Sequence, residues 1–209
     1  MESPVRYLST VLLWILWCAL HSTLITTAVT DYMKKELGDR YRFYRLFYNT
    51  VAVVTLLPLA YYSLSIEGAP VFRWQGPLAI AKYLLQVTSL YLFIAGARHY
   101  RMSQFLGIHQ IKTGQADQTL SEHDTFDVTG ILGVIRHPWY VSGMMIIWVR
   151  DISLSALLNN IVISVYFVVG AILEERKLAL QFGEQYRDYR KNVSMFIPYK
   201  WLNRETNNK

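Results

Sequence analysis

Long uncharged stretches dominate the pattern of apolar and polar positions along the chain. Leu8–Val29, Phe47–Ile66 and Ile152–Leu173 contain no lysine, arginine or acidic residue, and Pro77–Ala97 contains only Lys82. A helix of about 20 apolar residues crosses the roughly 30 Å of hydrocarbon in a bilayer. A helix of a soluble bundle would instead carry a polar stripe. Each stretch therefore predicts a membrane-spanning helix.

A shorter apolar segment, Trp139–Val149, precedes the last stretch and is separated from it by Arg150 and Asp151. We interpret it as a short or tilted fifth span that forms a helical hairpin with the stretch that follows. The alternative is a helix lying in the membrane interface, which would leave four spans.

The distribution of positive charge supports five spans with the N-terminus outside. The inner connections would then be residues 30–46, residues 98–137 and the tail from residue 174, which together hold most of the 21 lysines and arginines. Outside would lie only Arg6, Arg73 and Arg150. Cytoplasmic connections are enriched in lysine and arginine, so the pattern predicts a cytoplasmic C-terminus. Topology also accounts for the net charge of +6, and no nucleic acid partner is expected.

Composition agrees with a membrane protein. Apolar residues make up 53% of the chain and charged residues 17%, whereas soluble domains carry about 25% charge. The fold class predicted is an all-α integral membrane protein with about five transmembrane helices and a cytoplasmic amphipathic C-terminal helix. We expect one membrane domain over residues 1–209, comprising three spans in 1–97, a connection in 98–138, and the hairpin and tail in 139–209.

The tail after the last span has helical periodicity. Apolar residues recur there every three or four positions, which predicts an amphipathic helix. They are Leu178, Phe182, Tyr186, Tyr189, Val193 and Phe196. Cys18 is the only cysteine, so neither a disulfide nor a metal site is expected.

Polar residues near the membrane gather in two places in the C-terminal half. Arg136 and His137 precede Pro138, which suits the first turn of a helix, where unpaired N–H groups can bind an anion. Glu174 and Glu175 follow the last span directly, and carboxylates near membrane depth indicate function. The alternatives are an ordinary helix entry at the first place and a solvated helix end at the second.

These two blocks resemble the isoprenylcysteine carboxyl methyltransferase superfamily. The resemblance rests on Arg136-His137-Pro138-x-Tyr140-x-x-Gly143 and on Glu174-Glu175-x-x-Leu178-x-x-x-Phe182-Gly183-x-x-Tyr186-x-x-Tyr189. The first half is similar to a narrower branch, the NnrU-type proteins and membrane methanethiol S-methyltransferases, at Leu20-His21-Ser22, Tyr41-Arg42-x-x-Arg45-x-x-Tyr48-Asn49 and Phe105-Leu106-Gly107.

The resemblance implies a bacterial inner-membrane enzyme that uses S-adenosylmethionine. The residues that it places at the cofactor are Phe126, Leu132, His137, Pro138, Trp139, Tyr140 and Glu174. Leu132 stands where the family usually has tyrosine. An arginine that helps to bind a carboxylate substrate in the isoprenylcysteine enzymes falls near Gly170 here.

The missing arginine favours a small apolar thiol, such as methanethiol, as methyl acceptor. A thiol is partly ionised at neutral pH, so a weak base suffices, and no catalytic base is assigned. His21 is expected to line the membrane side of the site. A lipid or an isoprenylcysteine is the alternative acceptor. A different class of function is haem binding by His21 with His99 or His109, as in some NnrU-type relatives. No oligomeric state is predicted.

Overall fold

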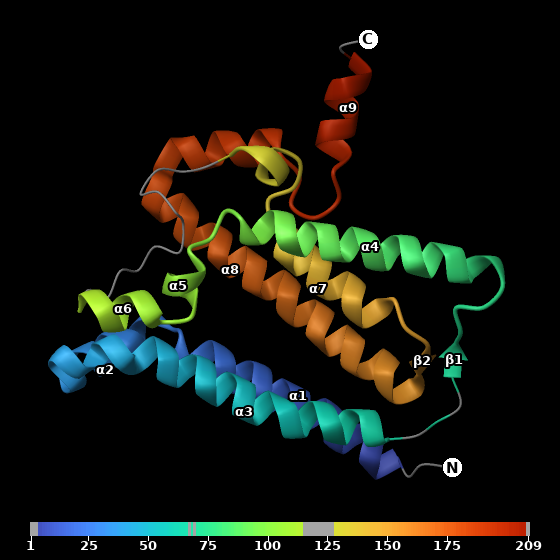
Figure 1. The fold of residues 1–209 in the computed structure, drawn as a ribbon, viewed down its shortest axis with the longest axis horizontal. Helices are drawn as coiled ribbons and strands as arrows, with labels where there is room; N and C mark the ends of the chain where they lie inside the picture. Colours follow the sequence, from blue (N-terminus) through green and yellow to red (C-terminus); the bar gives the residue numbers. More distant parts are fainter. Residues whose placement is uncertain (1–3, 67, 69, 115–127, 208–209) are drawn as a thin grey trace. The chain divides into compact units, whose positions relative to one another are not determined.

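The computed structural model describes residues 4–66, 68, 70–114 and 128–207, and these are almost wholly helical (Figure 1). The longer helices are α1 (Pro4–Leu24), α2 (Thr27–Leu37), α3 (Tyr44–Ser65), α4 (Pro77–Ala97), α7 (Pro138–Trp148), α8 (Leu154–Asn192) and α9 (Tyr199–Asn207). Short helical turns are η1 (Gly38–Phe43), α5 (Met102–Phe105), α6 (Ile108–Thr113) and η2 (Gly130–Gly133). Strands β1 (Pro70–Phe72) and β2 (Ile152–Ser153) pair antiparallel. The predicted all-α class is confirmed.

Four helical stretches among the described residues are long and apolar enough to cross a membrane. They are α1, the continuous stretch Thr27–Ser65, α4 and α8. The predicted fifth span, α7, has only 11 residues, which is about half of what a bilayer requires. A fifth crossing and the side on which the termini lie therefore stay predictions.

The burial pattern is the reverse of that of a soluble protein. Thr10, Ser142 and Asn160 are fully buried, whereas Leu16 and Ile80 are 64% and 67% exposed. Small polar side chains bind one another between helices in a membrane, and large apolar ones face the lipid. This distribution supports the assignment of the uncharged helices to a bilayer.

The chain divides into two compact units. The first holds α1, α2, η1, α3, the strand pair, α5, α6 and residues 154–163 of α8. The second holds α4, η2, α7, the remainder of α8, and α9. The single membrane domain inferred from the sequence stays a prediction.

Neutral hydrogen bonds join the helices of the first unit. The Thr10 hydroxyl of α1 lies 3.0 Å from the Ser63 hydroxyl of α3, and Asn159 Nδ2 donates to Thr10 Oγ1 over 3.2 Å. Trp14 Nε1 donates to Ser63 Oγ over 3.0 Å. These bonds satisfy polar groups that have no water partner in an apolar environment.

Close packing joins α4 and α7 in the second unit, where the two helices run side by side (Figure 1). Ser89 Oγ donates to the Ser142 carbonyl over 3.0 Å, and Ser142 Oγ donates to the Ser89 carbonyl over 2.9 Å. A Cβ atom at Gly96 would lie only 2.7 Å from Cδ1 of Trp139. The helices therefore approach closely because this position has no side chain.

Helix α8 carries the apolar run and the predicted tail helix as one element with a bend. The bend is at Gly183, whose φ of 55° lies in a region that glycine adopts readily. Beyond the bend, Tyr186, Tyr189 and Val193 form a buried cluster. The predicted amphipathic stripe is thus used for packing, and its last members follow the end of the helix at Asn192.

Candidate functional site

The segment before α7 is held against the segment after α8 by backbone hydrogen bonds. Ile135 forms a parallel bridge with Ser194. The Arg136 amide donates to the Ser194 carbonyl over 2.9 Å, and the His137 amide donates to the Met195 carbonyl over 3.2 Å. The two blocks singled out in the sequence therefore meet in the second unit.

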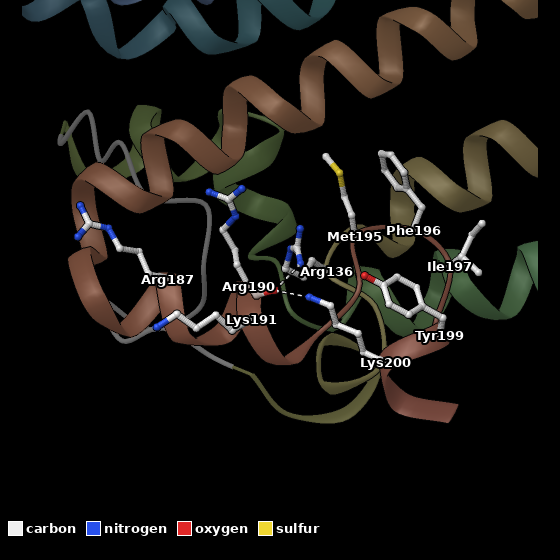
Figure 2. A pocket seen from close by; sticks show the side chains of 9 residues that line it. All are labelled: Arg136, Arg187, Arg190, Lys191, Met195, Phe196, Ile197, Tyr199 and Lys200. Atoms are coloured by element: carbon white, nitrogen blue, oxygen red, sulfur yellow. Dashed lines mark hydrogen bonds between the residues drawn. The ribbon is translucent and has the colours of Figure 1, made fainter. Parts of the chain in front are cut away.

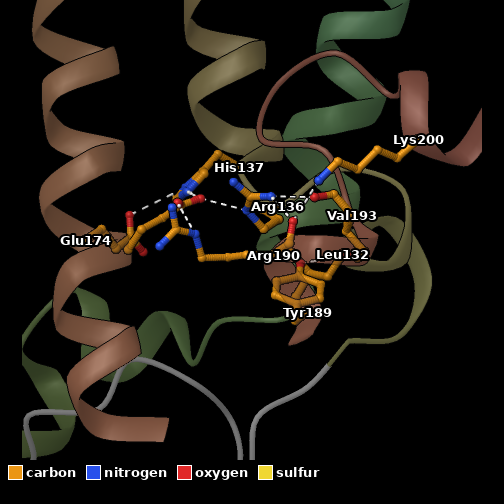
Figure 3. Close-up of polar contacts among 9 residues, drawn as sticks. Leu132, Arg136, His137, Glu174, Tyr189, Arg190, Val193 and Lys200 are labelled. Atoms are coloured by element: carbon orange, nitrogen blue, oxygen red, sulfur yellow. Dashed lines mark hydrogen bonds and ion pairs between the residues drawn. The ribbon is translucent and has the colours of Figure 1, made fainter. Parts of the chain in front are cut away.

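A buried carboxylate, Glu175, is the centre of the polar network at this place. Its side chain is 5% exposed, and its Oε1 lies 2.6 Å from Arg136 Nε and 3.2 Å from His137 Nε2. Arg190 Nε lies 3.1 Å from the other oxygen. Figure 3 shows Arg136 and His137, from the segment before α7, and Arg190, from the last part of α8, converging on this place. A buried carboxylate is stable only with such partners, so Glu175 fixes the positions of the side chains around it.

Glu174, the neighbouring carboxylate, is used differently. Its side chain is 34% exposed, and its Oε2 lies 3.7 Å from His137 Nδ1. This distance is long for a hydrogen bond, so the contact is mainly electrostatic. Glu174 is therefore partly exposed, while Glu175 is enclosed by the protein's own cations.

Aromatic rings surround the start of α7. The Trp139 ring stacks on Tyr100, with centroids 4.4 Å apart, and its indole N–H donates to the Phe93 carbonyl over 2.9 Å. The Tyr140 ring makes an edge contact with His137, with centroids 5.3 Å apart. These contacts hold the first turn of α7 through side chains as well as through the backbone.

Electrostatics keep one of these rings neutral. Burial raises the pKa of Tyr100, and the negative charge of Glu174 raises this pKa further. A phenol is already neutral at physiological pH, and the raised pKa keeps the Tyr100 proton in more alkaline solution as well. Aromatic faces next to a partly exposed carboxylate form an environment that suits a cation.

Gly170 on α8 faces the Tyr140 ring. A Cβ atom at this position would lie 3.5 Å from Tyr140 Cε1, which is ordinary contact distance. The position that the resemblance assigns to a substrate-binding arginine is therefore next to a predicted cofactor residue and carries no charge.

The structure brings five predicted site residues together: His137, Pro138, Trp139, Tyr140 and Glu174. Pro138 occupies the first turn of α7, as expected. Leu132 lies nearby in η2, where its backbone carbonyl accepts a bond of 2.7 Å from the Tyr189 hydroxyl. Phe126 lies outside the described residues. The contact of all seven predicted residues with a cofactor stays a prediction.

His21 belongs to the first unit. It lies on α1, and its Nε2 is 2.5 Å from the Tyr48 hydroxyl. His99 belongs to the second unit, with Nε2 positioned 3.3 Å from where a Gly130 Cβ would be. Among the residues that the structure describes, there is no cluster of three or more histidine, cysteine or acidic side chains able to hold a metal ion.

Sequence reasoning assigned no role to Arg190 or Tyr100. It singled out Glu175 together with Glu174 at the end of an uncharged run, but placed only Glu174 at the cofactor. Arg190 gives no such signal, because its contact with Glu175 depends on the bend at Gly183 between them.

Comparison with known proteins gives a consistent family assignment. A 66-residue stretch is 36% identical to a methanethiol S-methyltransferase of Pseudomonas deceptionensis, covering 31% of this chain and 25% of that protein. A 124-residue stretch is 28% identical to methanethiol S-methyltransferase 1 of Bradyrhizobium diazoefficiens, covering 59% of this chain and 41% of that protein. A 73-residue stretch is 37% identical to a methanethiol S-methyltransferase of Mycobacterium tuberculosis, covering 34% and 29%.

The chain thus spans between a quarter and about two fifths of the length of these relatives. No solved structure matches it. The family model for the NnrU protein matches residues 10–195, which is most of the chain. The membrane helices, the paired C-terminal blocks and this match agree, and the chain belongs to the NnrU protein family.

Proposed function

We propose that this protein is a membrane methyltransferase that uses S-adenosylmethionine to methylate the sulfur of a small thiol such as methanethiol. The observation that carries the proposal is the Glu175 network, which brings together the two blocks that resemble methyltransferases. The names of the relatives support the same reaction.

The residues at the start of α7 fit a cationic methyl donor. S-adenosylmethionine, when bound, would supply a methyl carbon that a thiolate attacks in line, so that a thioether forms while the bond to the sulfonium sulfur breaks and S-adenosylhomocysteine leaves. Glu174 offers a partly exposed carboxylate, and Tyr140, Trp139 and Tyr100 offer aromatic faces. Both kinds of group attract a sulfonium or ammonium ion.

The protein's contribution to the reaction would be orientation and exclusion of water. Two reactants held in line gain much of the acceleration that a bimolecular displacement requires. Stacking holds Trp139, and the contact with Glu175 holds His137, so the first turn of α7 is rigid. The acceptor must lose its S–H proton, because the thiolate is the nucleophile.

The environment of Gly170 favours a neutral acceptor over a carboxylate. A buried carboxylate requires a cationic partner, and none stands at this position next to Tyr140. A lipid amine or an isoprenylcysteine remains the alternative acceptor.

A direct assay distinguishes these acceptors. Full-length protein purified in detergent is incubated with methyl-labelled S-adenosylmethionine and, separately, methanethiol, phosphatidylethanolamine and a farnesylated cysteine. We expect labelled dimethyl sulfide, measured by headspace gas chromatography. Labelling of the prenylated cysteine alone would reject the thiol and keep a methyltransferase. Labelling of none of the acceptors, by protein with a normal thermal transition, would reject the proposed function.

Binding of the donor is tested separately by calorimetry. Glu174→Gln, His137→Ala and Tyr140→Ala should each weaken S-adenosylmethionine binding, and the Glu174 variant should do so without lowering the thermal transition. The matched control is Glu184→Gln, because Glu184 is an exposed glutamate paired with Arg187 on the same helix. Unchanged donor affinity in well-folded Glu174→Gln would contradict the assignment of this residue.

The proposal includes a bacterial inner membrane and a cytoplasmic C-terminus, so that the donor reaches the site from the cytoplasm. A compartment-sensitive reporter fused after Trp201 should give a cytoplasmic signal. A periplasmic signal would contradict the proposed topology.

The haem hypothesis is tested by the absorbance of the purified protein. The hydrogen bond between Tyr48 and His21 gives this histidine a role that does not involve haem. We expect no Soret band; a stoichiometric one would favour the haem-binding class.

A further inference from the structure

A pocket of about 600 Å³ opens beside the Glu175 network in the second unit. It is lined by Arg136, Arg187, Arg190, Lys191, Met195, Phe196, Ile197, Tyr199 and Lys200. Figure 2 shows the cations of α8 on one side and the apolar side chains after α8 on the other. The lining thus has a charged half and an apolar half, the pattern that an amphiphilic ligand requires.

The charged half has an excess of positive charge. Glu175 is shared between Arg136 and Arg190. Lys200 Nζ donates to the Arg190 carbonyl over 2.8 Å, and this acceptor is a neutral group.

The carboxylates nearest the other two cations lie in exposed pairs. Lys191 contacts Asp188 over 2.8 Å, and Arg187 contacts Glu184, with all four side chains at least 60% exposed. Such pairs are weak in water, and their cations can turn towards a stronger anion.

The apolar half is exposed to a degree that suits contact with lipid. Ile197 is 72% exposed and Tyr199 is 53% exposed. Tyr199 is the first residue of α9, in which Leu202 is 51% exposed and Trp201 is 39% exposed. Aromatic and apolar side chains alternating with lysine and arginine are typical of a segment at a membrane surface.

We propose that this pocket binds the phosphate group of an anionic phospholipid. Arg187, Lys191 and Lys200 would contact the phosphate, and Ile197 and Tyr199 the glycerol and first acyl carbons. Arginine and lysine are the side chains that bind phosphate most strongly. The methyl donor is a poorer match, because it carries two positive charges and one negative charge and would be repelled by the excess of cations.

The test measures binding and is independent of methyl transfer. Full-length protein in a non-ionic detergent is titrated by calorimetry with dihexanoyl phosphatidylglycerol, dihexanoyl phosphatidylcholine and inorganic phosphate. Wild-type protein should bind the phosphatidylglycerol more tightly than either of the other two. Phosphatidylcholine has no net charge, so its comparison with phosphatidylglycerol tests the contribution of the lipid's charge. Inorganic phosphate has no glycerol or acyl chains, so its comparison tests the contribution of the lipid part.

A pair of matched variants locates the site. Lys191→Gln with Lys200→Gln should weaken phosphatidylglycerol binding by about fivefold for each lysine. Arg176→Gln with Lys177→Gln removes the same charge from exposed positions of α8 outside the pocket lining, and should change binding less than about twofold.

Four results would overturn the proposal: equal binding of phosphatidylcholine, equal binding of inorganic phosphate, equal losses in the two double variants, or displacement of the lipid by S-adenosylmethionine. If the lysine variant does not fold, the three ligands compared on wild-type protein decide the question.

Discussion

In the first unit, neutral hydroxyl, amide and indole groups join the helices, as between Thr10, Ser63 and Asn159. At the end of the apolar part of α8, by contrast, the polar contacts are between full charges. Neutral groups can be buried in an apolar environment once each has a partner. Burying a charge costs far more, and this cost is greatest in lipid. The charged network accordingly begins only at Glu174 and Glu175, where the uncharged run ends.

The comparison indicates that the two kinds of contact have different uses. Neutral pairs between helices contribute stability and leave the chain's surface apolar. The network at Glu175 enforces one arrangement of His137, Arg136 and Arg190, because any other arrangement leaves a buried charge without its partner. The proposed role of these side chains in binding would account for this cost.

The largest effect is expected from Glu175→Gln. Loss of the carboxylate leaves Arg136, whose side chain is 8% exposed, without its counter-charge. Removing one partner of a buried ion pair destabilises a protein by about 3–5 kcal/mol. Donor affinity and methyl transfer should fall with it. The measurements are thermal unfolding in detergent and calorimetry with S-adenosylmethionine.

Glu184→Gln is the control for this variant, since the Glu184 pair with Arg187 is exposed on the same helix. Its effect on unfolding should stay below about 1 kcal/mol. Similar losses in the two variants would show that burial of Glu175 has no special role, and the distinction between neutral and charged contacts would fail.

The second effect concerns close packing of α4 and α7. Gly96→Ala places a methyl group 2.7 Å from Trp139, whose indole is fixed by its bond to the Phe93 carbonyl. Overpacking of this kind costs about 1–3 kcal/mol. Gly170→Ala is the control, because its methyl group would meet Tyr140 at 3.5 Å. It should be neutral or slightly stabilising, since alanine favours a helix by about 1 kcal/mol over glycine. If thermal unfolding in detergent is unchanged in Gly96→Ala, the Trp139 ring can move away from the added methyl group.

The third effect is smaller and tests the link between η2 and α8. Tyr189→Phe removes the bond to the Leu132 carbonyl and keeps the buried ring. One hydrogen bond contributes about 0.5–1.5 kcal/mol, so the thermal transition should fall slightly. Donor affinity should change little if Leu132 acts only through its backbone. A large loss of affinity with an unchanged transition would instead support a direct cofactor role for this segment.

Much of the fold could be predicted because the bilayer imposes simple rules on the sequence. A run such as Pro77–Ala97 can only be a helix when it lies in lipid, since a helix satisfies its own backbone groups. The boundary between α7 and α8 was also predictable, from the charged pair Arg150 and Asp151 between two apolar segments. The short length of α7 was predictable too, since the apolar segment Trp139–Val149 has the same 11 residues as the helix Pro138–Trp148.

The candidate site was predictable only in part. The spacing of the two blocks placed His137, Tyr140 and Glu174 correctly near one another. The sequence could not distinguish Glu174 from Glu175, because successive helical residues face different directions and only the packing partners decide which of them is enclosed. The contact of Arg190 requires the bend at Gly183, whose direction no local rule supplies.

The smallest effect is expected from the neutral contact between Thr10 and Asn159 in the first unit. This contact tests what neutral groups contribute, as Glu175 tests what charged groups contribute. Side-chain hydrogen bonds between membrane helices contribute about 0.6 kcal/mol on average. We expect a coupling energy of this size in a double-mutant cycle of Thr10→Val and Asn159→Ala, from thermal unfolding in detergent. The second hydrogen bond of the Thr10 hydroxyl, to Ser63, cancels in the cycle if it is unaffected by Asn159. Donor affinity should be unchanged in all three variants, because neutral pairs contribute stability and do not position ligands. A coupling above about 2 kcal/mol, or a loss of donor binding without loss of stability, would contradict the separation of roles.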